Sequence, residues 1–138
     1  IIDSLRKYNG ASLTMVPTLV QYAGIAALSH PPFKNEKIIK DRLNLAITEL
    51  NKLGWEGLHL PSYGYNIWLP IPDTFSCGKE FSDYSLRKCC VGVCPGEAFG
   101  RGGGKFVRLT MMNDEAQIQE ALLRWKFSGI NQNMPKKI

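Results

Sequence analysis

The chain has 138 residues, of which 44% are apolar and 21% charged, and its formal net charge is +5. This composition excludes a disordered chain, and the length allows one domain with a real core but not two large ones. The basic residues are scattered, apart from Lys136-Lys137 and the pair Arg101 and Lys105. A solvated basic surface is therefore a simpler interpretation than a nucleic-acid groove, although an anionic ligand would fit the charge equally well.

Targeting signals and cysteines further restrict the class of protein and its compartment. No apolar run approaches the roughly 20 residues that a bilayer-spanning helix needs, so we expect no membrane association. The opening Ile1-Ile2-Asp3 carries no signal peptide and no initiator methionine, which suggests a piece of a longer protein. The cysteines form no C-x-x-C pair, so we expect free, buried thiols in a reducing compartment, the cytoplasm, rather than a zinc site. They are Cys77, Cys89, Cys90 and Cys94.

Two helices are predicted in the first part of the chain. Residues 13–29 are apolar on several sides, which indicates a helix packed on several sides, with Pro17 in its first turn and an end at His30-Pro31. Asn35 is the expected cap of a second helix that stops at Gly54. One face of this helix is apolar, comprising Ile39, Leu43, Ala46, Ile47, Leu50 and Leu53.

Short strands and two further helices are predicted after Trp55. Residues 57–60 and 65–69 have strand character and flank a turn at 61–64, and a loop at 73–79 precedes a short helix at 81–88. Strands are expected at 91–94 and at 106–111. Because neighbouring residues of a strand point to opposite faces, adjacent Cys89 and Cys90 would do so on a strand. A last helix starts at Asn113-Asp114 and ends at Gly129. Helices covering one face of a small, mainly antiparallel sheet give an α+β fold.

Arg108 is the most informative single residue. It lies between Val107 and Leu109 in an apolar strand, where a charge is costly unless it meets an anion or reaches water. A strand arginine most often reaches water. The preceding glycine loop fails as a Walker phosphate loop, because the leading glycine would have to stand at Phe99 and Lys105 is followed by Phe106 and a strand pattern. This loop is interpreted as a flexible connection, with an anion-binding nest of backbone N–H groups as the alternative.

The string VGVCPGEAFG at residues 91–100, followed by FVRL at 106–109, resembles the closing motif of the class I/II, fold type I, pyridoxal-phosphate-dependent aminotransferases. Residues 16–28 are similar to that family's glutamine-bearing helix, and residues 61–72 to its P-x-x-G-aromatic strand. The resemblance covers residues 5–127. It implies that residues 1–30 end the large domain and link it to the small C-terminal domain at 31–130, with a mobile tail at 131–138.

The resemblance also implies a function. The full-length enzyme would transfer an amino group between an amino acid and a 2-oxo acid, and Arg108 would hold the substrate's α-carboxylate. Pyridoxal 5′-phosphate would be bound mostly by the large domain, upstream of Ile1. The lysine that binds the cofactor is expected to be absent, because Lys7 of the S-x-x-K string is interpreted as a surface residue. The chain alone is therefore expected to be inactive.

The resemblance also implies a partner subunit, and other functions remain as competing hypotheses. In the family the enzyme is a homodimer, and Ser12 and Thr14 would approach the partner subunit's active site; the alternative is that they cap the following helix. Cys90 stands where the family usually has a glycine or another small residue. No nucleic acid is expected. The competing hypotheses are a self-sufficient basic module that binds phosphate or RNA through Arg101 and Lys105, and a decarboxylase or lyase built on the same small domain.

Overall fold

The computed structural model describes residues 1–12, 15–30 and 35–135. The contacts divide the chain into two compact units, Ile1–Phe33 and Lys34–Ile138. Each unit is considered by itself.

The first unit consists of the helices α1 (Ile2–Ser12) and α2 (Thr18–Ser29). α1 was not predicted. α2 starts later than predicted, with Pro17 at its N-cap rather than in its first turn. All described residues of both helices are exposed, so the predicted packing of α2 on several sides is not found within the described part of the chain.

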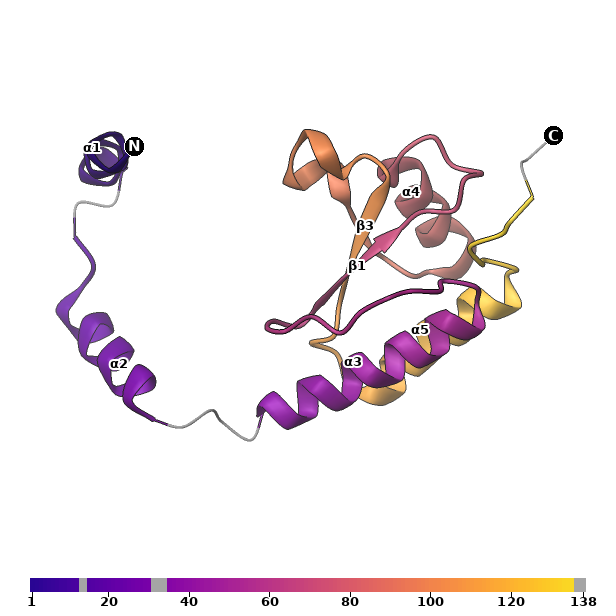
Figure 1. Ribbon diagram of the computed structural model, residues 1–138, viewed down its shortest axis with the longest axis horizontal. Helices are drawn as coiled ribbons and strands as arrows, with labels where there is room; N and C mark the ends of the chain where they lie inside the picture. Colours follow the sequence, from indigo (N-terminus) through magenta and orange to yellow (C-terminus); the bar gives the residue numbers. More distant parts are fainter. Residues whose placement is uncertain (13–14, 31–34, 136–138) are drawn as a thin grey trace. The chain divides into compact units, whose positions relative to one another are not determined.

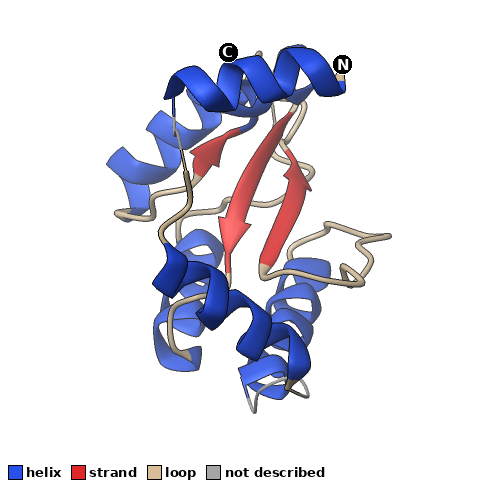
Figure 2. Ribbon diagram, turned by 90° about the vertical axis from the view of Figure 1, so that its left-hand side faces the viewer, coloured by secondary structure: helices blue, strands red, loops and turns tan. Residues whose placement is uncertain are grey.

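The second unit is an α+β fold, which confirms the predicted class (Figure 1). Its three strands form one antiparallel sheet in the order β1-β3-β2 and lie side by side in Figure 2. The elements are α3 (Asn35–Lys52), β1 (Asn66–Pro70), α4 (Gly78–Cys89), β2 (Cys94–Pro95), the 3-10 turns η1 (Gly96–Phe99) and η2 (Arg101–Gly103), β3 (Phe106–Thr110) and α5 (Glu115–Phe127).

The core lies between one face of the sheet and the helices α3, α4 and α5. Ile67 and Leu69 of β1 and Val107 and Leu109 of β3 are buried, while the alternate residues of both strands are more exposed. Trp125 of α5 is fully buried, and its ring centroid lies 5.7 Å from that of Trp55 and 5.5 Å from that of Phe81. The other face of the sheet is thus the one opposite α3, α4 and α5.

The start of α5 and the ends of α3 and α5 follow the predicted signals. Asp114 Oδ1 accepts a hydrogen bond from the Gln117 N–H at 2.8 Å, which caps α5. Gly54 and Gly129 have φ of +90° and +73°, the left-handed conformation that favours glycine after a helix. Beyond Gly129, Thr74 Oγ1 donates to the Met134 carbonyl at 2.6 Å, so this part of the expected tail is bonded to the rest of the second unit.

Two predicted strands are wrong in whole or in part. Residues 57–60 form no strand: Gly57 is in a turn with φ of +74°, and Leu58 packs on the core without pairing. Only Cys94 of the predicted strand 91–94 joins the sheet. The cause is that the Val91 and Val93 carbonyls accept hydrogen bonds from the Ser85 and Ser82 hydroxyls of α4, at 2.7 and 2.6 Å.

The cysteines also differ from the prediction. Cys89 is the last residue of α4 and Cys90 caps it in the left-handed conformation, so the two do not alternate on a strand. Cys89 is buried as expected, but Cys77 and Cys94 are half-buried and Cys90 is exposed. The expectation of buried thiols thus holds for one of the four.

Candidate functional site

Arg108 lies in the central strand of the sheet, on the face opposite α3, α4 and α5. Its cross-strand partners are Trp68 of β1 and Cys94 of β2. Because strand residues alternate between the two faces, burial of Val107 and Leu109 in the core directs the half-buried Arg108 to the opposite face. The strand predicted at 106–111 is confirmed here as β3 (Phe106–Thr110).

Three aromatic rings surround this position. The Arg108 Cζ atom lies 4.8 Å from the centroid of the Phe99 ring, a cation–π contact. Trp68 stacks on Phe106 with centroids 5.5 Å apart and meets Phe99 edge-on at 5.6 Å. The guanidinium is thus flanked by apolar surface that excludes part of its water.

Nothing in the described part of the chain neutralises Arg108. Its Nε atom is buried and has no hydrogen-bond partner, and its side chain forms no ion pair among the described residues. The strands place no acidic residue and no lysine on this face, which carries Asn66, Trp68, Pro70, Cys94, Phe106, Arg108 and Thr110. A half-buried guanidinium without a counterion is matched to a planar anion that accepts two parallel hydrogen bonds, as a carboxylate does.

The loop that carries Phe99 is fixed by its backbone. A Cβ atom on Gly96 would overlap the Gly103 carbonyl, and one on Gly103 would overlap the Gly96 carbonyl, so these two segments cross at a distance that only glycine permits. The Glu97 carboxylate accepts a hydrogen bond from the Lys79 N–H at 3.2 Å, in the first turn of α4. Hydrogen bonds from backbone N–H groups, first that of Glu97 itself and then that of Lys79, lower the pKa of Glu97.

The other predicted site residues lie elsewhere. Ser12 is the last residue of α1, where its exposed hydroxyl donates to the Tyr8 carbonyl at 2.8 Å, so it does not cap α2. Thr14 lies outside the described residues. Lys7 is exposed on α1. Lys105 Nζ donates to the Phe75 carbonyl at 3.3 Å, so this lysine of the glycine loop makes a contact within the unit.

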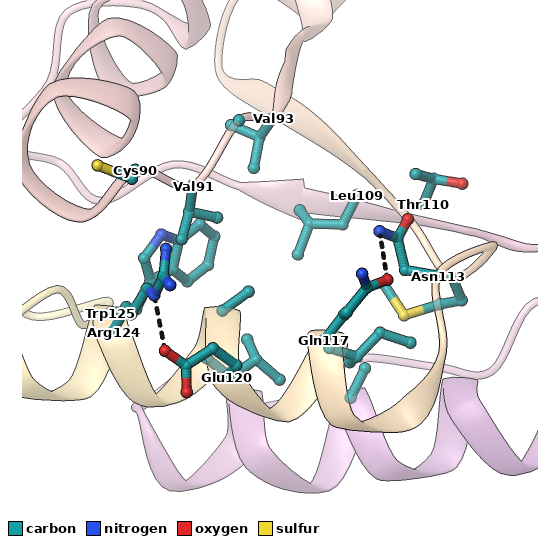
Figure 3. Close-up of a pocket in the computed structure, with 16 residues that line it drawn as sticks. Cys90, Val91, Val93, Leu109, Thr110, Asn113, Gln117, Glu120, Arg124 and Trp125 are labelled. Atoms are coloured by element: carbon teal, nitrogen blue, oxygen red, sulfur yellow. Dashed lines mark hydrogen bonds and ion pairs between the residues drawn. The ribbon is translucent and has the colours of Figure 1, made fainter.

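A hollow of about 330 Å³ lies on the core side of the sheet, between residues 90–93 and α5 (Figure 3). Its apolar wall includes Leu109, Leu122 and Trp125. The polar groups at its edge are paired with each other: Asn113 with Gln117 at 3.1 Å, and Arg124 with Glu120 at 2.8 Å. It is separate from Arg108 because Leu109 and Arg108 point to opposite faces of β3.

The described residues offer neither a candidate membrane span nor a cluster of metal ligands. None of the described helices is long and apolar enough to cross a membrane. No group of three or more His, Cys, Asp or Glu side chains in the described ranges is placed to hold a metal ion.

The chain matches no family model. It is nevertheless similar to known proteins in both sequence and structure. Transaminase BacF of Bacillus subtilis is 36% identical over 109 residues, which are 76% of this chain and 27% of BacF. The apo-BacF structure superposes with a TM-score of 0.70 at 33% identity, covering 79% of this chain and 28% of BacF. The chain belongs with the fold type I aminotransferases.

A second relative extends this agreement along the chain. The LL-diaminopimelate aminotransferase of Halothermothrix orenii is 32% identical over 133 residues, which are 94% of this chain and 34% of that enzyme. The chain therefore spans about a third or less of the length of the aminotransferases it matches. The predicted family and fold are confirmed by these comparisons.

Two residues of the site were not singled out from the sequence. Phe99 lies within the closing motif at 91–100 and Trp68 within the aromatic strand at 61–72, but neither motif marks them as site residues. Their proximity to Arg108 depends on strand register and on the path of a glycine loop. The available signal was the alternation that places Trp68 and Phe106 on the face opposite the apolar core.

Proposed function

We propose that this chain acts as the C-terminal part of a pyridoxal-phosphate-dependent aminotransferase and that Arg108 binds the α-carboxylate of the substrate. The full-length enzyme transfers an amino group between an amino acid and a 2-oxo acid, and works as a homodimer. The observation that carries the proposal is the guanidinium of Arg108, which has no counterion among the described residues and lies on the face of the sheet opposite α3, α4 and α5. The motif around it and the aminotransferase relatives support the same function.

The residues of this chain do not fit a complete cofactor site. Pyridoxal phosphate needs a lysine for its aldehyde and a set of donors for its phosphate, whereas the strands bring no lysine to the face of Arg108 and Lys7 is exposed on a separate unit. When bound, the cofactor supplies the electron sink for amino-group transfer. We therefore assign its binding to the part of the enzyme outside this chain, and expect the chain alone to be inactive.

The contribution of Arg108 is positioning. A guanidinium that holds the carboxylate through two hydrogen bonds fixes the rotation of the substrate, and with it the direction of the Cα–H bond that must lose its proton. The surrounding rings reduce the exposure of the ion pair to water, which strengthens the interaction. Lysine could supply the charge but not the planar pair of donors.

The test is substitution of Arg108 in the full-length enzyme. Arg108→Ala should lower kcat/KM for the amino acid at least tenfold, equivalent to about 1.4 kcal/mol of transition-state stabilisation, and Arg108→Lys should restore only part of it. Arg101→Ala is the matched control, since Arg101 is an exposed arginine of the neighbouring loop. Unchanged kinetics of Arg108→Ala would overturn the assignment.

A further inference from the structure

We propose that Phe99 is a positioning residue that holds the Arg108 guanidinium in place for the carboxylate. This inference rests on the proposed function of Arg108 and adds a second residue to it. The primary observation is the 4.8 Å separation between Arg108 Cζ and the centroid of the Phe99 ring.

Phe99 is not required by the core. Its side chain is 51% exposed, and it does not belong to the buried cluster or to the half-buried residues packed against it. Its neighbours are Arg108 and Trp68, both on the candidate substrate-binding face.

The ring is placed by a rigid support. Phe99 ends η1, whose first residue, Gly96, makes the glycine-only crossing with Gly103. The second residue, Glu97, is anchored to the first turn of α4 through the Lys79 N–H. Both constraints act within three residues of Phe99, so the ring position is determined by the backbone and does not depend on contact with a ligand.

The consequence for Arg108 is pre-organisation. An arginine side chain has several rotatable bonds, and ordering it on binding costs free energy that lowers affinity. A ring against the guanidinium restricts these rotations before the ligand arrives, and cation–π attraction leaves the N–H donors available. The buried Nε without a partner shows that the base of the guanidinium is already enclosed.

A double-mutant cycle in the full-length enzyme tests the role. We would measure kcat and KM for the fastest donor among the standard amino acids, with 2-oxoglutarate as acceptor. Phe99→Leu should raise KM about fivefold with a smaller change in kcat, because loss of the ring weakens the hold on the carboxylate. Phe99→Tyr, which keeps the ring, should recover most of the affinity. Phe127→Leu is the matched control, since Phe127 is 84% exposed at the end of α5.

Combining Phe99→Leu with Arg108→Ala distinguishes a positioning role of Phe99 from a purely structural one. If Phe99 acts through Arg108, then Phe99→Leu should change KM little once the arginine is gone. An equal loss in both backgrounds, or no loss in either, would overturn the positioning role. If Arg108→Ala itself has no effect, the proposed function fails, an outcome distinct from failure of Phe99 alone.

A spectroscopic readout needs no catalysis. In the 138-residue chain, the Nε–H signal of Arg108, assigned by its disappearance in Arg108→Ala, should carry a ring-current shift from Phe99. Phe99→Leu should remove that shift and Phe127→Leu should leave it. An Nε–H signal at the same position in the wild type, Phe99→Leu and Phe127→Leu would show that the ring does not hold the guanidinium.

Discussion

The Trp125 indole N–H donates a hydrogen bond to Ser85 Oγ at 2.8 Å, across 40 positions of sequence, and Ser85 is fully buried. The same hydroxyl donates to the Val91 carbonyl at 2.7 Å. One serine therefore joins α5, α4 and the segment that leads to the candidate site. A hydroxyl that both accepts and donates at a buried position is satisfied on both sides.

Replacing this serine tests its contribution to stability. Ser85→Ala leaves the Trp125 N–H and the Val91 carbonyl without a partner, and should lower the free energy of unfolding by about 2–3 kcal/mol. Ser82→Ala is the control, since Ser82 makes one such bond, to the Val93 carbonyl, and should cost about 1 kcal/mol. Urea unfolding followed by circular dichroism measures both. Equal, small losses would contradict a shared role of Ser85.

Cys90 offers a stabilising substitution. It is the one non-glycine residue with positive φ recorded in the described part of the chain, at φ of +55°, and it is the C-cap of α4. Cys90→Gly removes the conflict between Cβ and the backbone and should raise the free energy of unfolding by about 0.5–1 kcal/mol. Cys90→Val should lower it, because a β-branched side chain fits this conformation poorly. Thermal unfolding of both variants gives the sign, and stabilisation by valine would refute the argument.

The pKa of Glu97 predicts an acid dependence. The pKa lies below its ordinary value of 4.5, mainly because the carboxylate accepts the backbone N–H of Glu97 and then that of Lys79, while desolvation opposes the shift. A depressed pKa stabilises the folded state above the unfolded value, and this stability is lost as pH falls through the folded value. The free energy of unfolding should therefore decrease below about pH 4.5 in the wild type, and it should decrease less steeply in Glu97→Gln.

The control for this pH dependence is Glu56→Gln, which removes an exposed carboxylate from a turn. Urea midpoints measured from pH 7 to pH 3 compare the three proteins. The control should keep the wild-type slope in acid. If Glu97→Gln follows the wild type at every pH, the carboxylate does not anchor η1 to α4.

The fold was predictable where one segment determines its own structure. The apolar stripe of α3, the start of α5 at Asn113-Asp114 and the strand around Arg108 are local patterns, and each appears in the structure as predicted. The strand at 91–94 failed because the serine hydroxyls of α4 take the carbonyls that a neighbouring strand would have used. No local pattern records that competition, just as none records the contact between Phe99 and Arg108.

The exposed face of α2 predicts self-association of the isolated chain. Leu19, Tyr22, Ile25 and Leu28 are 82%, 69%, 62% and 90% exposed. A helix that is apolar all round is normally buried, so this surface should associate with another copy when the rest of the enzyme is missing. Light scattering should give a mass above 15.5 kDa that rises with concentration. Leu19→Glu with Leu28→Glu should return the chain toward the monomer, whereas Phe127→Glu, at an exposed ring of the second unit, should not. A monodisperse monomer for the unmodified chain would contradict the prediction.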